Sequence, residues 1–143
     1  MKSIMKHYEG KFKMIHSLLS KDDPVVVEIG AHYGEDSLRF LETFKNIELY
    51  CFEPDPRNIS IFKKYVNDER VELFELALSN EKGEAKFYQS YQDGTETPEK
   101  YDWIDSEEYT NKALNNSGSS SLKKGYSYLL GEPVNVRTER YDS

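Results

Sequence analysis

The sequence has almost no cysteine and no long apolar run. Its single cysteine among 143 residues, Cys51, excludes an internal disulfide and a cysteine-based metal cluster. No segment approaches the roughly 18 consecutive apolar residues of a membrane-spanning helix, and the first residues lack the apolar segment of a secretory signal. We therefore expect a cytoplasmic protein with no membrane partner, in which Cys51 is a small apolar residue of the core.

Basic residues are also scarce. Lysine and arginine total 19 against 26 aspartates and glutamates, which gives a formal net charge of −7. Nucleic acids and anionic membrane surfaces attract basic patches, so this balance argues against both as partners. The length is that of one domain with a real hydrophobic core, and we expect residues 1–143 to form a single domain.

One stretch, residues 25–34, organises the rest of the chain. Residues 25–29 form an apolar, β-branched run that predicts a strand buried on both faces, as at the centre of a parallel sheet. A strand, a glycine turn and a helix are the ligand-binding element of doubly wound α/β proteins. We expect Gly30 to let the chain turn tightly and Gly34 to let a ligand approach the helix start. Glu28 needs a hydrogen-bond partner, because an unpaired buried carboxylate is costly.

Periodicity predicts the neighbouring elements. Apolar spacing indicates a helix over residues 4–19. Helices then alternate with strands, which we expect to be parallel. Asp55 is a typical N-cap, with Pro56 at the first helical position. The predicted helices after the glycine turn cover residues 36–45 and 56–66, and the predicted strands cover residues 47–52 and 71–78.

This alternation stops after residue 78. A polar turn precedes a short strand over residues 85–89, which we expect to pair antiparallel with the strand before the turn. The remainder is long and polar, and in it we expect a helix over 105–114, a helical turn over 126–130 and a last strand over 134–138. The predicted fold class is therefore α/β, with three parallel strands and an antiparallel addition.

Glu53 ends the second predicted parallel strand. An acidic residue at this position typically accepts hydrogen bonds from the ribose hydroxyls of a nucleotide cofactor. Two hydroxyls facing one carboxylate form a charge-assisted, bidentate pair. The alternative is a solvated carboxylate at a helix cap, and the glycine turn in the preceding unit favours the nucleotide.

The glycine pattern discriminates between nucleotides. His32 stands where the dinucleotide fingerprint has its middle glycine, and no lysine follows Gly34 as in a P-loop. A glutamate, two flanking glycines and an acidic end to the next strand resemble the S-adenosylmethionine site of Rossmann-like methyltransferases. Two alternatives stay open, which are an NAD-dependent oxidoreductase and a non-catalytic binding module that pairs through a sheet edge.

Further segments extend this resemblance. In order along roughly two-thirds of the chain, they are similar to the FkbM family of methyltransferases. That family consists of O-methyltransferases that act on hydroxyls of sugars and polyketides. The resemblance therefore implies S-adenosylmethionine as cofactor and a small-molecule or glycan acceptor. The segments are residues 27–34, 51–56, 76–80 with Gly83 and Phe87, 119–122, and 134–138 with 140–142.

The resemblance also implies the contacts of the site. The turn residues would line the methionine end of the cofactor, and Glu53 would hold the ribose. Pro54, Ala77 and Leu78 would border the adenine. No catalytic residue and no metal ligand is assigned. His32 could touch cofactor or substrate, or could only hydrogen-bond the backbone of its own turn. The implied cofactor-binding residues are Glu28, Gly30, Ala31, His32, Tyr33 and Gly34, then Glu53, then Pro54, Ala77 and Leu78, with Ser119 and Ser120 near the substrate.

The family pattern continues past the position of residue 142 into a further strand and the rest of the sheet. This chain stops at Ser143, so we expect it to be incomplete at its C-terminus and to leave residues 25–29 as an apolar sheet edge. Such an edge exposes unpaired backbone groups and promotes association. We therefore expect a homodimer through this edge or a second chain that covers it. The base that deprotonates an acceptor hydroxyl is expected outside residues 1–143.

Overall fold

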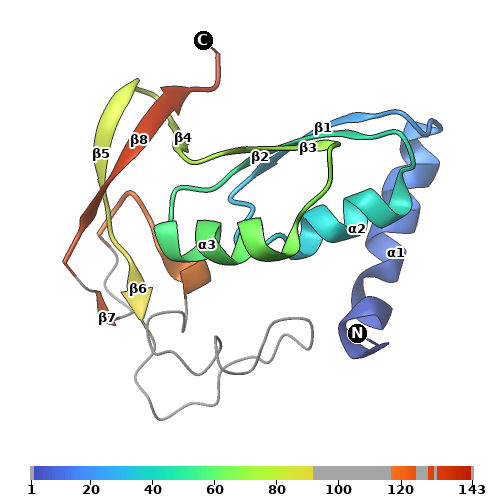
Figure 1. The fold of residues 1–143 in the computed structure, drawn as a ribbon, viewed down its shortest axis with the longest axis horizontal. Helices are drawn as coiled ribbons and strands as arrows, with labels where there is room; N and C mark the ends of the chain where they lie inside the picture. The colour runs from blue at the N-terminus through green and yellow to red at the C-terminus, as the bar shows by residue number, and fades with distance from the viewer. Residues whose placement is uncertain (1, 92–116, 125–128, 131, 143) are drawn as a thin grey trace.

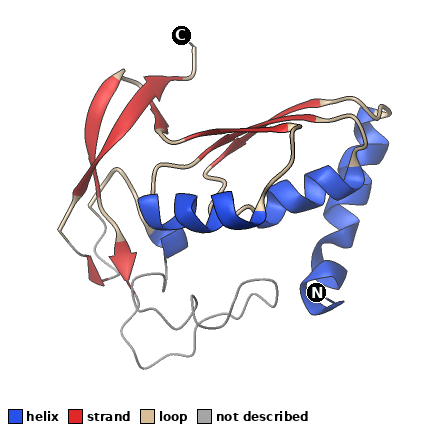
Figure 2. Cartoon of the chain, viewed as in Figure 1, coloured by secondary structure: helices blue, strands red, loops and turns tan. Residues whose placement is uncertain are grey.

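A parallel three-stranded sheet with helices along one face forms the centre of the molecule (Figures 1 and 2). The computed structural model describes residues 2–91, 117–124, 129–130 and 132–142. The parallel pairing of the central strands confirms the predicted α/β class and is compatible with a Rossmann-like fold. The central elements are α1 (Lys2–Leu19), β1 (Val25–Ile29), α2 (Glu35–Thr43), β2 (Glu48–Phe52), α3 (Pro56–Tyr65) and β3 (Val71–Phe74), and the sheet order is β1-β2-β3.

The core lies between this sheet and its helices. Alternation along β2 turns Leu49 and Cys51 toward the helices, where both are almost fully buried. They pack with Phe44 at the end of α2 and with Phe62 of α3 in one apolar cluster. The prediction that Cys51 is a small apolar core residue is confirmed.

The opposite face of the sheet is bare among the described residues. Val25, Val27 and Ile29 are 60%, 56% and 67% exposed, so the prediction that this strand is buried on both faces is wrong. The prediction of an apolar edge is confirmed, because β1 pairs with β2 and with no other strand that the structure describes. Phe52 and Phe74 stack on the same face, with ring centroids 4.8 Å apart.

A second sheet stands at one end of the first (Figure 1). The single strand predicted over residues 71–78 is wrong, because Leu76 N–H donates to Phe74 O (2.9 Å) in a tight turn that separates β3 from β4. The antiparallel pairing expected across the polar turn is also wrong, since β8 lies between β4 and β5. The second sheet consists of β4 (Ala77–Ser79), β8 (Val134–Arg140) and β5 (Gly83–Phe87).

The remaining elements are short. β6 (Ser90–Tyr91) pairs antiparallel with β7 (Leu129–Leu130), so the helical turn predicted over residues 126–130 is wrong at its last two residues. A 3₁₀ turn, η1 (Ser117–Ser119), lies beside β6. The helix predicted over residues 105–114 lies outside the described residues. Among the described helices, none combines the length and apolar character needed to cross a membrane.

Local capping signals are confirmed at α3. The Asp55 side chain accepts a hydrogen bond from Arg57 N–H (3.0 Å), and Pro56 occupies the first helical turn. This cap matters for the site, because it fixes the chain directly after β2.

Gly34 is required by packing. Its φ is 93°, and a Cβ there would lie 2.3 Å from Val66 Cγ2 and 3.0 Å from Phe62 Cδ2. The end of α3 occupies the space that a side chain would need at Gly34, and the expected approach of a ligand to the Gly34 backbone stays a prediction. Gly30 also has a positive φ, 77°, but no atom lies within 4 Å of the position that a Cβ would take there. Gly30 thus serves the tight turn, as expected, and its predicted contact with a cofactor stays a prediction.

Replacing Gly34 by alanine should destabilise the fold by about 2–4 kcal/mol, since left-handed backbone strain adds to overpacking. Gly30→Ala carries only the strain and should cost about 1–2 kcal/mol. Gly10→Ala, in α1 with open space around it, should stabilise by about 0.5–1 kcal/mol. Urea unfolding followed by circular dichroism measures all three. Equal losses for Gly34→Ala and Gly30→Ala would contradict the packing role of Gly34.

Candidate functional site

The carboxyl ends of β1 and β2 meet at the glycine turn. Gly30 N–H and Ala31 N–H both donate to Phe52 O, at 2.8 and 3.0 Å. These bonds fold the turn back against the end of β2, and Ala31 is buried there. The positive φ of His32, 54°, continues the turn. The structure therefore brings the turn and the residues after β2 together, as open α/β sheets do at their ligand sites.

Glu53 joins these two segments. Its Oε2 accepts from His32 N–H (2.8 Å), and its Oε1 accepts from Asp55 N–H (2.9 Å) and from Asn58 Nδ2 (3.2 Å). The side chain is 4% exposed, so the alternative of a solvated cap carboxylate is wrong. Burial raises the pKa of Glu53, while the N–H donors oppose that rise.

One acceptor beside Glu53 has no partner among the residues that the structure describes. Asn58 is 2% exposed, and no described residue donates a hydrogen bond to its Oδ1. Its amide nitrogen is held by Glu53, which leaves the oxygen free to accept. A buried acceptor without a donor is costly, typically about 1–3 kcal/mol. A ligand that donates a hydrogen bond here would remove that cost.

Arg57 ties the start of α3 to a distant segment. Its guanidinium pairs with Asp55 (2.7 Å) and donates to Ser90 O (3.1 Å) and to Ser120 Oγ (3.0 Å). Gln89 Nε2 also donates to Asp55, at 2.8 Å. This network holds Ser120 beside the start of α3, whereas Ser119 lies one position earlier, at the end of η1. The predicted proximity of both serines to a substrate stays a prediction.

The His32 side chain is held from both sides. Nδ1 lies 2.8 Å from Glu35 Oε1, and Nε2 lies 3.0 Å from Ser117 Oγ. The Tyr33 hydroxyl is 2.8 Å from the same Ser117 Oγ, and the two rings of His32 and Tyr33 lie 3.7 Å apart. Burial raises the pKa of Tyr33. The alternative in which His32 contacts only backbone is therefore wrong.

Glu28 is a residue of β1, and its side chain lies on the face of the sheet that packs against α2. It accepts from Ser37 Oγ (2.6 Å) and from the Cys51 thiol (3.6 Å), which confirms the expected need for partners. Burial raises its pKa to about 7, and the Ser37 hydrogen bond opposes that rise. Burial likewise raises the pKa of Cys51 to about 12, so Cys51 is a thiol at neutral pH.

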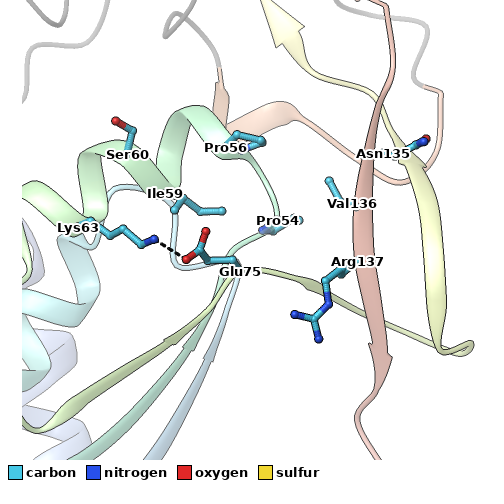
Figure 3. A pocket seen from close by; sticks show the side chains of 9 residues that line it. All are labelled: Pro54, Pro56, Ile59, Ser60, Lys63, Glu75, Asn135, Val136 and Arg137. Carbon is cyan, nitrogen blue, oxygen red and sulfur yellow. Dashed lines mark hydrogen bonds and ion pairs between the residues drawn. The ribbon is translucent and has the colours of Figure 1, made fainter.

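The predicted adenine residues are divided between two places. Ala77 and Leu78 belong to β4, where Ala77 packs with Phe87 and Val136 in the second sheet. Pro54 instead lines a pocket of about 380 Å³ between α3 and β8 (Figure 3). No residue of the glycine turn lines this pocket.

The pocket has both apolar and charged lining residues. Pro54, Ile59 and Val136 provide apolar surface. Lys63 forms an ion pair with Glu75, and Arg137 extends from β8 toward them (Figure 3). Neither His32 nor Glu53 lines this pocket.

Sequence reasoning missed three residues of this network. Glu35 and Asn58 carry local signals, since each lies in the first turn of a helix that follows a strand of the sheet. Ser117 carries none, because it meets His32 from 85 positions away. Within the described ranges, no group of three or more histidine, cysteine, aspartate or glutamate side chains could hold a metal ion.

Comparison with curated proteins relates the chain to a methyltransferase. It is 32% identical over 131 residues to the 2-O-methyltransferase NoeI of Sinorhizobium fredii. The matched segment is 91% of this chain and 50% of that protein, so the chain spans about half the length of the curated relative it matches. No family model and no solved structure matches the chain.

Replacing Glu28 by glutamine should make stability less sensitive to pH. The native pKa of about 7 lies above the usual 4.5, so the unfolded chain loses this proton first as the pH rises. As the pH rises from 4.5 to about 7, the free energy of unfolding of the wild type should fall by about 3 kcal/mol, whereas that of Glu28→Gln should not show this fall. Urea unfolding at a series of pH values measures this difference. Glu48→Gln, an exposed carboxylate on β2, reports the general effect of removing one charge. A constant difference between wild type and Glu28→Gln across this range would contradict the shifted pKa.

Proposed function

We propose that this chain binds S-adenosylmethionine at the carboxyl edge of β1 and β2 and takes part in O-methylation. The proposed acceptor is a hydroxyl of a sugar or other small metabolite, as the resemblance to the FkbM family implies. The similarity to a 2-O-methyltransferase supports methyl transfer to oxygen. When bound, this cofactor supplies a methyl group on a positively charged sulfur.

The paired acceptors Glu53 and Asn58 carry this proposal. Ribose hydroxyls are hydrogen-bond donors, and Asn58 Oδ1 is a buried acceptor that has no donor within the described part of the chain. The Glu53 carboxylate lies directly beside it, 3.2 Å from the Asn58 amide nitrogen. The residues present therefore fit the ribose of a nucleoside cofactor. A carboxylate has about four acceptor sites, so Glu53 can accept from a ribose hydroxyl while it keeps its bonds to the turn and to α3.

Charge at this edge also fits a cationic cofactor. Glu35 of α2 and Glu53 after β2 both contact the glycine turn, and Glu28 lies on β1 two residues before Gly30. Burial raises the pKa of Glu28, and the charges of Asp36 and Glu35 add to that rise. A sulfonium ion and an ammonium group would offset this crowding of carboxylates. A pyrophosphate would add to it.

The dinucleotide alternative is disfavoured by the same turn. A dinucleotide places its pyrophosphate at the helix N-terminus, where backbone N–H groups point at the phosphates. Here Glu35 Oε2 already accepts from Tyr33 N–H (3.1 Å), and the His32 side chain replaces the middle glycine. A carboxylate therefore takes the place that a phosphate would need.

Calorimetric titration of this chain tests the proposal. S-adenosylmethionine and S-adenosylhomocysteine should bind, and Glu53→Ala should weaken both about tenfold or more, because each lost charge-assisted hydrogen bond is worth about 1.5–3 kcal/mol. Asn58→Ala, which keeps the Glu53 carboxylate, should weaken both more mildly.

Two controls accompany this titration. Glu72→Ala removes an exposed carboxylate from β3 and should leave affinity unchanged. Circular dichroism verifies that each variant is folded at the temperature used. Binding of NAD in place of the sulfonium ligand would favour the oxidoreductase, and binding of neither would contradict the proposed cofactor.

The bare edge of β1 supports a second candidate, a partner chain that pairs with it. No charged side chain of β1 points to the bare face, because Val25, Val27 and Ile29 occupy it. Edge strands normally carry such charges to prevent pairing. We propose that a second copy of the chain adds a strand here.

Substitution on β1 tests this pairing. Sedimentation velocity at rising concentration should show self-association of the wild type. Val27→Lys should reduce it by placing a charge on the apolar face, whereas the isosteric Val27→Thr should keep most of it. A monodisperse monomer at every concentration would rule out the second copy.

A further inference from the structure

Three side chains from separate segments form an acid, imidazole and hydroxyl series at the glycine turn. Glu35 belongs to the first turn of α2, His32 to the turn after β1, and Ser117 to η1. The imidazole lies between the other two, 2.8 Å from the carboxylate and 3.0 Å from the hydroxyl. A positioned acid behind an imidazole is the arrangement that activates general bases in enzymes.

The hydrogen-bond network defines where the protons lie. An ionised carboxylate only accepts hydrogen bonds, so the Glu35 contact places the imidazole proton on Nδ1. Nε2 is then the acceptor, and the Ser117 hydroxyl donates to it. The Tyr33 hydroxyl can donate to Ser117 Oγ in turn, at 2.8 Å. The basic nitrogen of His32 is therefore the one that faces away from Glu35.

Exposure separates the group that a substrate can reach from those that it cannot. The His32 and Glu35 side chains are 18% and 23% exposed. Ser117 and Tyr33 are 3% and 1% exposed, so neither hydroxyl is placed to attack a substrate. This difference favours a base over a serine nucleophile, although both would use the same series of residues.

A backbone hydrogen bond holds His32 beside Glu53, at the proposed cofactor site. Its backbone N–H donates to Glu53 Oε2, and its positive φ places it at the tip of the turn. The charged and titratable groups around the ring come from several elements. Among the described residues these include Glu35 of α2, Glu53 after β2 and Tyr33 of the turn, on which the charge of Arg57 of α3 also acts.

We propose that His32 is the general base that deprotonates the acceptor hydroxyl, with Glu35 as a positioning residue, and this rests on the proposed O-methylation. This base lies within residues 1–143, in contrast to the expectation from the sequence. The acceptor hydroxyl replaces Ser117 at Nε2, and its O–H bond breaks as the proton moves to that nitrogen. An oxygen lone pair forms the new C–O bond, and the C–S electron pair of S-adenosylmethionine stays on sulfur. Glu35 stabilises the resulting imidazolium until it loses its proton to water.

Nuclear magnetic resonance of the ¹⁵N-histidine-labelled chain tests the proton assignment without turnover. Long-range ¹H–¹⁵N correlations should show His32 protonated on Nδ1 alone at pH 8, and Glu35→Gln should abolish that preference. His32→Asn identifies its signals among the three histidines. A proton on Nε2 in the wild type would overturn the assignment.

Methyl transfer tests the base itself. The probes are tritiated S-adenosylmethionine and a panel of methyl hexopyranosides. His32→Asn should lower kcat by about 10²–10³-fold with little change in S-adenosylhomocysteine affinity. Asparagine is chosen because it tolerates a positive φ. In His32→Gly, which also tolerates it, added imidazole should restore part of the rate.

A pH profile separates the roles of the two residues. Glu35→Gln should lower kcat about tenfold and move the low-pH limb of the rate profile to lower pH, because the imidazolium loses its counter-charge. His16→Asn is the matched control, since His16 also pairs with a carboxylate, Asp22 at 3.0 Å, and lies outside the site. It should leave rate and profile unchanged.

The outcomes distinguish the two proposals. Full activity of His32→Asn would overturn the base and leave the O-methylation intact. If His32→Asn loses both its activity and its affinity for S-adenosylhomocysteine, His32 is only a structural residue of the turn. No transfer by the wild type to any acceptor of the panel would overturn the proposed function, and the base with it.

Discussion

The buried carboxylate of Glu53 is the interaction on which the candidate site depends. It takes hydrogen bonds from the turn after β1 and from the start of α3, and so joins two segments that no strand pairing connects. Removing it would leave two backbone N–H groups buried without an acceptor, each at a cost of about 1–3 kcal/mol. The position of the His32 ring follows from the same contact, because the bonded N–H belongs to His32.

Two carboxylates at this edge are partly or fully buried, and burial disfavours their charged forms. Burial raises the pKa values of both Glu28 and Glu53, and hydrogen bonds only partly offset that rise. Perturbed acids that gather at the carboxyl ends of parallel strands are typical of functional sites. A cationic ligand would stabilise the charged forms of both carboxylates. This supports the proposed cofactor, as does the similarity to a methyltransferase.

The described helices cover one face of the central sheet, and the other face combines apolar side chains with the exposed carboxylates Glu48 and Glu72. Parallel sheets are stable when layers pack against both sides, because their strands carry apolar side chains in both directions. The exposed valines of β1 and the stacked pair of Phe52 and Phe74 are the apolar part of the uncovered face. Exposed apolar side chains in this number support the proposed pairing with a second copy.

The sequence by itself determined the features that depend on neighbouring residues. The β-branched run of β1, the cap at Asp55 with Pro56 and the tight turn at Gly30 each rest on contacts within a few positions, and the structure has all three. Tertiary structure alone decided that β8 lies between β4 and β5, that Val66 fills the space at Gly34, and that Ser117 meets His32. These contacts join residues far apart in the chain. Periodicity reports which face of an element is apolar, but not which distant segment will cover it.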